Sequence, residues 1–245
     1  MISSLARQIG VAFVVLTAPA AAQSRLPPDF VHLRDVDATI AQDMRYAGAN
    51  NFTGHALPGY GAADCVLRRD AAAALRRVQD DLRPAGLSLK VYDCYRPRRA
   101  VNAMARWAQA PEDGTTRRFY PGLDKRRLFA DGWIAYRSRH SAGIAVDLTL
   151  VPMSPQLPPN HPPGDCDTTP AGAEASVAMG TAFDCFSAKS YTRSPAIGAE
   201  ARTNRDRLRA AMGRHGFRNY FREWWHFEFR GGAPAAAYDV PIPAH

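Results

Sequence analysis

The stretch "SRHSAGIAVDLTL", residues 138–150, combines an apolar run with two side chains that bind metals or move protons. The run from Ile144 to Leu150 predicts a buried strand. His140 precedes this strand and Asp147 lies inside it, with small residues between them. The two polar side chains therefore either are solvated at a strand end or converge on a common ligand.

A second stretch, "EWWHFEF" at residues 223–229, favours convergence. Glu223 lies three residues before His226, and bulky aromatic residues surround both. A glutamate is rarely buried without a partner, because its charge is costly to desolvate. A metal bound by His226, with Glu223 facing the water on that metal, accounts for both residues. A core histidine is the alternative for either stretch alone, but together with His140 and Asp147 they make two His and one carboxylate, the ligand set of catalytic zinc.

Length and composition indicate a globular protein of one domain. The chain has 245 residues, 46% of them hydrophobic, and a formal net charge of +8. The basic residues are spread along the chain without an aromatic-interleaved basic stripe, so we expect no nucleic-acid partner. Attraction to an anionic envelope polymer is compatible with the charge but is not specific to it.

The N-terminus has the layout of a secretory signal peptide. The apolar run Ile9–Leu16 follows a single arginine, precedes a cluster of small residues, and is too short to span a bilayer. We expect cleavage after Ala22, with Ala20 as the other candidate, and export of residues 23–245 to the periplasm or the medium with no membrane partner. A buried N-terminal helix is the alternative reading of residues 1–22.

The cysteine count is even, which is typical of disulfides in an oxidising compartment. Cysteines stand at positions 65, 94, 166 and 185, and no CxxC pair indicates a structural zinc site. Three pairings are open. We favour Cys65 with Cys94 and Cys166 with Cys185, because the second would close a loop that has little else to hold it.

The pattern of elements predicts an α+β single domain, a small antiparallel-rich sheet with flanking helices. Residues 151–194 are rich in Pro and Gly and carry two cysteines, which predicts a long loop insertion. The segments expected to be regular are a short strand near 31–33, helices at 67–82, 99–108 and 203–215, and strands at 87–95, 144–150 and 223–230.

The two opening stretches resemble the SxHxxGxAxD and ExxH motifs of the zinc D-alanyl-D-alanine dipeptidases, the group known from vancomycin resistance, to which zinc D,D-carboxypeptidases are related. The resemblance continues in "RYAGANNFTG" (45–54), "VYDCYRPRRAVNAMARWAQAPE" (91–112) and "AMGTAFDCF" (178–186). It covers most of the chain, and the motifs follow the family's order.

The resemblance implies roles for five residues. His140, Asp147 and His226 match the ligands of one Zn²⁺ per chain, and Glu223 matches the catalytic base. Arg96, in "YRP", matches the arginine that stabilises the carbonyl oxygen as negative charge builds on it. One fixed donor at such an oxyanion contributes roughly 10² to 10³ in rate. A salt bridge at the surface is the structural alternative for Arg96.

The resemblance also implies substrate contacts. Tyr46 and Asp184 align with positions that hold the free ammonium of the dipeptide, and Ser138 aligns with a substrate-contacting serine. Ordinary packing for Tyr46 and a solvated loop acid for Asp184 are the alternatives. The insertion at 151–194, on the rim of the expected pocket, departs from the family pattern: it is longer and carries Cys166 and Cys185.

We therefore expect hydrolysis of D-Ala-D-Ala to two D-alanines, with a metal-bound water attacking and a glutamate as base. One alternative is a zinc D,D-carboxypeptidase acting on longer peptidoglycan peptides. Asp184 argues against it, because a carboxylate that meets the substrate ammonium favours substrates with a free amino group. Another is a non-catalytic cell-wall binding module, which would need no base such as Glu223. An exported enzyme cannot reach cytoplasmic precursors, which favours scavenging or wall turnover over resistance.

Overall fold

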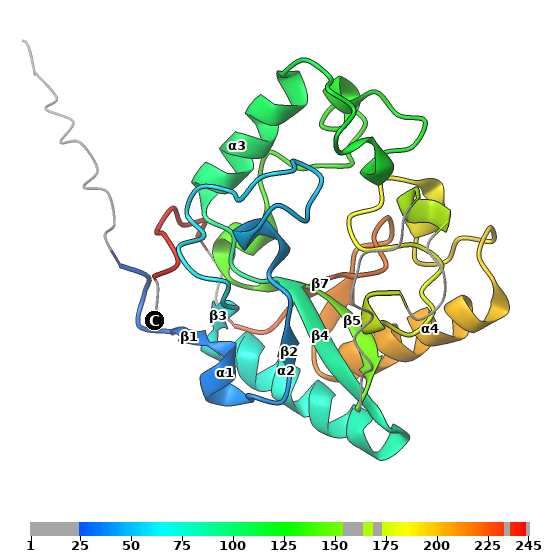
Figure 1. Ribbon diagram of the computed structural model, residues 1–245. Coiled ribbons are helices and arrows are strands. Elements are labelled where there is room, and N and C mark those ends of the chain that lie inside the picture. Colours follow the sequence, from blue (N-terminus) through cyan, green and yellow to red (C-terminus); the bar gives the residue numbers. More distant parts are fainter. Residues whose placement is uncertain (1–24, 154–163, 169–172, 233–235, 244–245) are drawn as a thin grey trace, which may run out of the picture.

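The computed structural model describes residues 25–153, 164–168, 173–232 and 236–243. Their main feature is a five-stranded sheet with the strand order β2-β4-β5-β7-β6 (Figure 1). Strand β2 is parallel to β4, and every other neighbouring pair is antiparallel. The strands are β2 (Ala41–Gln42), β4 (Leu87–Asp93), β5 (Ala145–Pro152), β7 (His226–Phe229) and β6 (Phe217–Asn219). The prediction of an antiparallel-rich α+β domain is confirmed.

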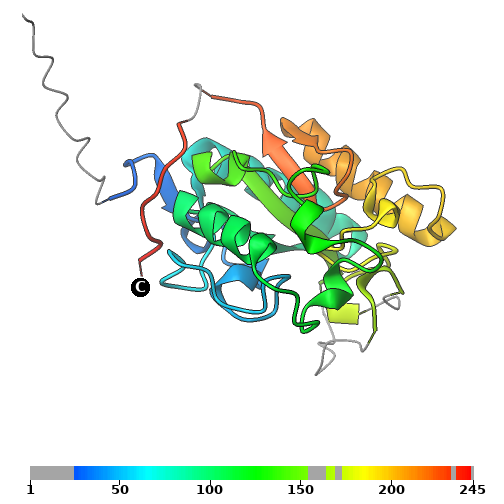
Figure 2. The same cartoon turned by 90° about the horizontal axis from the view of Figure 1, so that it is seen from above.

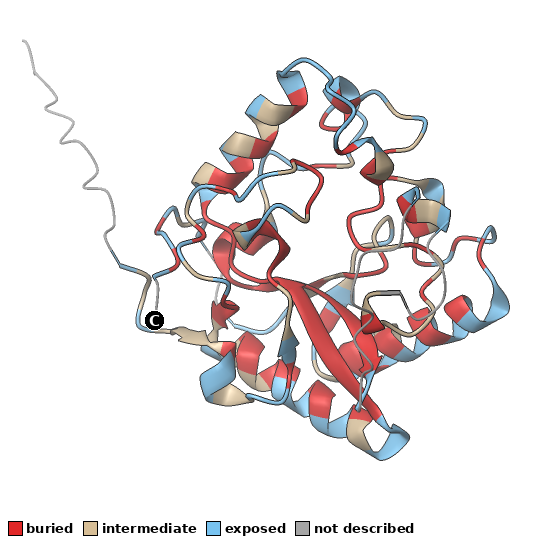
Figure 3. Cartoon of the chain, viewed as in Figure 1, coloured by how far each residue is buried: buried red, intermediate tan, exposed pale blue. Residues whose placement is uncertain are grey.

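Strand β5 lies at the centre of this sheet, between β4 and β7, and is buried along almost its whole length (Figure 3). Because successive side chains point to opposite faces, β5 serves two purposes. Val146, Leu148 and Leu150 join the larger apolar core on one face. Asp147 points to the other face, where the candidate site lies.

The larger core is closed by two helices, α2 (Arg69–Leu82) and α4 (Ala199–Arg214), which lie along one side of the sheet (Figures 1 and 2). The helix α2 forms because its apolar residues recur at helical spacing, as in Leu75, Val78 and Leu82, which are all buried.

A second, smaller core lies around helix α3 (Arg98–Gln109). It contains aromatic residues from several loops, among them Tyr46, Phe52 and Phe186. These three side chains also line the candidate site, so the second core forms one wall of that site.

Two element boundaries differ from the sequence prediction. Leu67 belongs to the short strand β3 (Val66–Arg68), which pairs antiparallel with β1 (Phe30–His32), so the helix begins only at Arg69. Helical periodicity cannot separate Leu67 from the helix, because the strand side chain and the helical face point into the same core.

The final strand is shorter than the predicted segment 223–230. It begins at His226, because the preceding residues form a turn in which Glu223 donates its backbone N–H to Tyr220. Strands β2 and β6 were not predicted, being only two and three residues long. The short helix α1 (Leu33–Val36) takes up the end of the strand expected near 31–33.

Both expected disulfides are present. Cys65 pairs with Cys94 and Cys166 with Cys185, across sequence separations of 29 and 19 residues. Cys166 opens a short 3₁₀ turn, and two further 3₁₀ turns, Ala173–Ala175 and Ala188–Ser190, mark the rest of the described insertion. The insertion itself starts inside β5, which continues to Pro152.

The expected signal peptide, residues 1–22, lies outside the described residues, as do parts of the insertion at 154–163 and 169–172. Among the helices of the described part of the chain, none is long and apolar enough to cross a membrane.

Candidate active site

Three side chains converge with the geometry of a metal centre. The Nε2 atom of His140 lies 3.2 Å from Oδ1 of Asp147 and 3.1 Å from Nδ1 of His226, and this Nδ1 lies 2.9 Å from the same Oδ1. Atoms about 3 Å apart can all lie at bonding distance, about 2 Å, from one ion. Two imidazole nitrogens and one carboxylate oxygen are the donors of catalytic zinc, so these residues fit that metal.

The sheet register brings the three residues together. Asp147 on β5 lies directly opposite His226 on β7. His140 stands in the 3₁₀ turn Arg139–Ala142, which Ser138 caps by accepting the backbone N–H of His140 on its Oγ at 3.2 Å. The turn ends at Gly143 with a φ of 69°, and a Cβ there would meet the ring of Phe30 at 2.3 Å, so only glycine fits.

Backbone contacts orient the first imidazole. Nδ1 of His140 lies 2.7 Å from the carbonyl oxygen of Cys94, to which it donates its proton. This assigns the tautomer in which Nε2 is free to bind a metal. The buried carboxylate of Asp93, 3.3 Å from the same Nδ1, supports that assignment.

The site attracts positive charge. Burial raises the pKa of Asp147, but the imidazoles of His140 and His226 outweigh this and hold the pKa below its ordinary value. Burial lowers the pKa of His226, and its contacts with Asp147 and Glu228 overcome this and raise the pKa to about 10. An ionised carboxylate between two imidazoles thus favours a bound cation, either a proton or a metal.

Glu223 lies in the turn before β7 and lines the same cavity. One of its carboxylate oxygens is 3.9 Å from Nδ1 of His226. Burial raises the pKa of Glu223 to about 7, with nearby His226 opposing the rise. A carboxylate with that pKa can both accept and return a proton near neutral pH.

Arg96 lies inside the cavity, not in a salt bridge on the surface. It follows β4, only 8% exposed, and its guanidinium contacts Asp93 at 2.8 Å and Asp147 at 3.5 Å. Its guanidinium carbon also lies 4.7 Å from the centre of the Tyr46 ring. The carboxylates keep Arg96 charged, because they outweigh its burial and raise its pKa. A fixed cation therefore lies beside the candidate metal ligands.

Asp93 is a residue that the sequence reasoning missed. It is fully buried, and besides Arg96 it accepts a hydrogen bond from the hydroxyl of Tyr60 at 2.6 Å. An irregularity in the β4–β5 register between Val91 and Asp93 places it opposite Asp147. The available signal was an acid inside the predicted strand 87–95.

Tyr46 and Asp184 also meet, although they are far apart in the sequence. The Tyr46 hydroxyl donates to Oδ2 of Asp184 at 2.8 Å, and both residues are buried. Burial raises the pKa of Asp184 well above its ordinary value, with Asp147 adding to the rise. An approaching cation would therefore stabilise the ionised form of this carboxyl group, as expected of a group that meets an ammonium.

One cavity of about 240 Å³ unites the predicted residues. All eight line it, namely Tyr46, Arg96, Ser138, His140, Asp147, Asp184, Glu223 and His226. The sequence reasoning did not single out Glu228, which also lines the cavity and lies two residues after His226 on β7.

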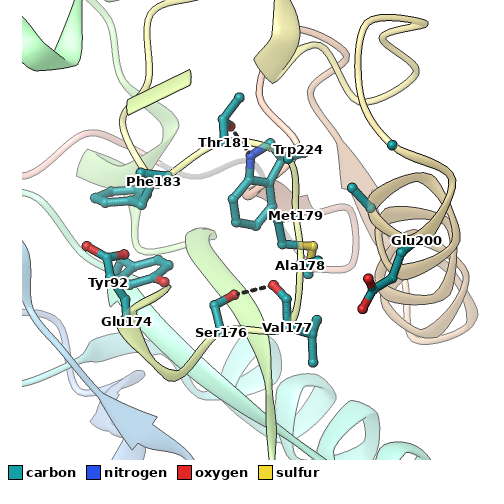
Figure 4. A pocket seen from close by; sticks show the side chains of 14 residues that line it. Tyr92, Glu174, Ser176, Val177, Ala178, Met179, Thr181, Phe183, Glu200 and Trp224 are labelled. Carbon is teal, nitrogen blue, oxygen red and sulfur yellow. Dashed lines mark hydrogen bonds between the residues drawn. The ribbon is translucent and has the colours of Figure 1, made fainter. Parts of the chain in front are cut away.

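A second pocket of about 180 Å³ lies between the described insertion and the start of α4 (Figure 4). Aromatic rings of Tyr92, Phe183 and Trp224 and the carboxylates of Glu174 and Glu200 are among its lining groups. None of the eight predicted residues lines it, so this pocket is separate from the candidate site.

The chain is similar to several known proteins. A family model described as D-ala-D-ala dipeptidase, peptidase family M15, matches residues 28–245. A D-alanyl-D-alanine dipeptidase of Streptomyces coelicolor is 35% identical over 87% of this chain and 98% of its own length. One from Enterococcus faecium is 32% identical over the same shares. The solved vancomycin resistance D,D-dipeptidase VanXYg, in complex with a D-Ala-D-Ala phosphinate analog, has a TM-score of 0.35 at 16% identity, over 82% of this chain and 66% of that chain.

Proposed function

This chain belongs to the D-Ala-D-Ala dipeptidase family of peptidases, and from that premise we propose that it hydrolyses D-Ala-D-Ala to two D-alanines with one zinc ion per chain. The observation that carries the proposal is the convergence of His140, Asp147 and His226 within about 3 Å of one another, beside the carboxylate of Glu223.

The metal would be held by Nε2 of His140, an oxygen of Asp147 and Nδ1 of His226. Zinc at such a site polarises a carbonyl group and lowers the pKa of water to about 7. The contact of His140 with the Cys94 carbonyl supports the assignment, since it leaves Nε2 unprotonated.

Glu223 is the proton-transfer group of the proposal. Burial raises the pKa of this carboxylate above its ordinary value, so that it can accept a proton from the attacking water and return that proton to the leaving amine. Arg96 stabilises the negative charge that develops on the carbonyl oxygen. Asp93 holds the arginine at 2.8 Å, so that it needs no rearrangement when that charge appears.

Tyr46 and Asp184 select the substrate in this proposal. The Asp184 carboxylate receives the free ammonium of the dipeptide, and the Tyr46 hydroxyl holds the carboxylate in place. A peptide acylated at this amine has no positive charge to offer. The site therefore favours a free dipeptide over a longer peptidoglycan chain.

We also propose that the protein acts outside the cytoplasm, in the periplasm or the medium. The expected signal peptide motivates this, and the two disulfides support it, because such bonds persist in oxidising compartments. N-terminal sequencing of the secreted protein tests the proposal. A mature chain that retains residues 1–22 would contradict it.

The decisive experiment combines metal analysis with substrate comparison. Purified protein should contain about one zinc per chain, lose hydrolysis on chelation and regain it with zinc. Free D-Ala-D-Ala should be cut much faster than N-acetyl-D-Ala-D-Ala, with L-Ala-L-Ala as the stereochemical control. Full activity without metal would overturn the mechanism, and equal rates on free and acylated substrates would favour a D,D-carboxypeptidase.

A further inference from the structure

A dipeptide carries two opposite charges, and the residues assigned so far receive only one of them. Asp184 faces the ammonium, while the carboxylate at the other end of the substrate has no partner yet. Three arginines line the cavity: Arg96, Arg137 and Arg139. Arg96 is already assigned to the carbonyl oxygen of the scissile bond, and its contacts with Asp93 and Asp147, at 2.8 and 3.5 Å, hold it at that position.

Arg137 and Arg139 stand on either side of Ser138, on the segment that leads into His140. Both arginines are exposed, and all three side chains line the cavity. The Ser138 oxygen accepts the backbone N–H of His140, so its own hydroxyl proton is free to be donated. Three donors thus gather on one segment beside a metal ligand.

The two arginines differ in how far their charge is balanced. Nε of Arg139 lies 3.8 Å from a carboxylate oxygen of Glu228, to which Arg230 is bound more closely, at 3.0 Å. Arg137 forms no ion pair with any residue in the described part of the chain. The charge of Arg137 is therefore the more available of the two for a ligand.

Resting on the proposed function, we propose that Arg137 and Arg139, with the Ser138 hydroxyl between them, bind the C-terminal carboxylate of the substrate. Arg137 supplies most of the attraction, and Arg139 is held in place through Glu228. The cavity then has an anionic contact for the substrate ammonium and a cationic contact for its carboxylate. It recognises a short zwitterion with the scissile bond between the two.

The test compares D-Ala-D-Ala with D-alanyl-D-alaninamide, which lacks the terminal charge. Arg137→Gln should raise the KM for D-Ala-D-Ala by about tenfold or more, because it removes a charge-assisted contact. The same variant should leave the KM for the amide and kcat nearly unchanged. Arg137→Lys should restore part of the loss, and Arg139→Gln should have the smaller effect.

Two controls separate this contact from other causes. Arg76→Gln, at an exposed arginine of α2 that does not line the cavity, makes the same change in net charge and should have no effect on either substrate. Calorimetric binding of both peptides to zinc-loaded Glu223→Gln, with and without Arg137→Gln, measures affinity without turnover. Adding Arg137→Gln to this variant should weaken the binding of D-Ala-D-Ala about tenfold and leave the binding of D-alanyl-D-alaninamide unchanged.

The inference would be overturned if the preference for D-Ala-D-Ala over its amide persisted both in Arg137→Gln and in the double variant Arg137→Gln, Arg139→Gln. So would an equal rise in KM for both substrates, which would mean that the arginine only shapes the segment. Neither result touches the proposed function, which is tested on the wild-type protein by its zinc dependence and by its rates on free and acylated D-Ala-D-Ala.

Discussion

The proposed metal ligands and the residue proposed to face the substrate ammonium lie in two differently built regions. Asp147 and His226 are fixed by the register of β5 and β7, and His140 by the 3₁₀ turn that leads into β5; these three residues are the sheet-borne part of the site. Asp184, the loop-borne part, stands on an insertion of short turns and has a positive φ of 58°.

The loop-borne part is held from outside the sheet. Arg45 binds Glu174 at 2.9 Å, and the adjacent Tyr46 binds Asp184 at 2.8 Å, so one short turn holds the insertion at two points. In the proposed function, the metal site thus depends on strand register, while the choice of substrate depends on a few side-chain contacts. Each prediction below tests whether the two regions can be changed separately.

The largest effect is expected from the sheet-borne ligands. His140→Ala or His226→Ala removes one of three donors, so the protein should lose both its zinc and its hydrolysis, down to background. Metal analysis and a turnover assay measure this together. His215→Ala, at the end of α4, is the matched control and should keep both. A ligand variant with normal zinc content would show that the centre is misassigned.

Glu223→Gln should have the next largest effect. It removes the proton acceptor and no ligand, so the rate should fall at least ~10²-fold while the zinc stays bound. Glu200→Gln, on the exposed surface of α4, serves as the control. If the Glu223 variant lost its metal instead, the glutamate would be a ligand and the sheet-borne part would be larger than described.

Asp184→Asn should change selectivity and spare the metal. A hydrogen bond to a charged group is worth about 1.5–3 kcal/mol, so kcat/KM for free D-Ala-D-Ala should fall roughly ten- to a hundredfold. N-acetyl-D-Ala-D-Ala should be affected much less, which narrows the gap between the two. Asp167→Asn, on the same insertion but outside the cavity lining, is the control. A parallel loss on both substrates would argue against an ammonium contact.

The acid side of the pH profile should report Glu223. The reaction requires the ionised carboxylate of Glu223, so kcat/KM should fall by about tenfold for each pH unit below the pKa of this group. Burial raises this pKa to about 7 in the metal-free site. A bound cation lowers it, which places the midpoint of the loaded enzyme below 7. An acid limb that persists unchanged in Glu223→Gln would assign the titration to another group.

The smallest effect on hydrolysis is expected from the insertion's own disulfide. Cys166→Ser with Cys185→Ser removes a crosslink worth roughly 3 kcal/mol in the chain-entropy model. Thermal unfolding should show the loss, while zinc content and turnover stay close to normal.

Removing Cys65 and Cys94 instead should weaken zinc binding, because the Cys94 carbonyl orients His140. Equal effects of the two pairs on zinc would contradict the separation of the two regions.

Much of the sheet-borne part was predictable from sequence because its residues lie in or beside strands. Asp147 interrupts an apolar run, and His226 stands among aromatic residues, so both are visible as polar groups where burial is expected. Asp93 was not singled out, although it lies inside the predicted strand 87–95 much as Asp147 lies inside its own. Only the register irregularity after Val91 places it beside the metal ligands.

Contacts between distant segments explain the other limits. No local pattern links Tyr46 to Asp184, so their predicted proximity came from family resemblance alone. The helix start at Arg69 and the strand start at His226 depend on pairing with β1 and on a tight turn. Tertiary contacts decide both boundaries, whereas periodicity records only which residues are apolar.

Asp93 also bears on how the protein can evolve. This one carboxylate contacts Tyr60, Arg96 and His140, so any replacement alters the arginine and the histidine together. Selection cannot tune one of these functions there without disturbing the other. Within the described part of the chain, Asp184 does not link two such groups; its hydrogen bond comes from the hydroxyl of Tyr46. Descendants of this chain should therefore acquire new substrates through the insertion, while Asp93 drifts least.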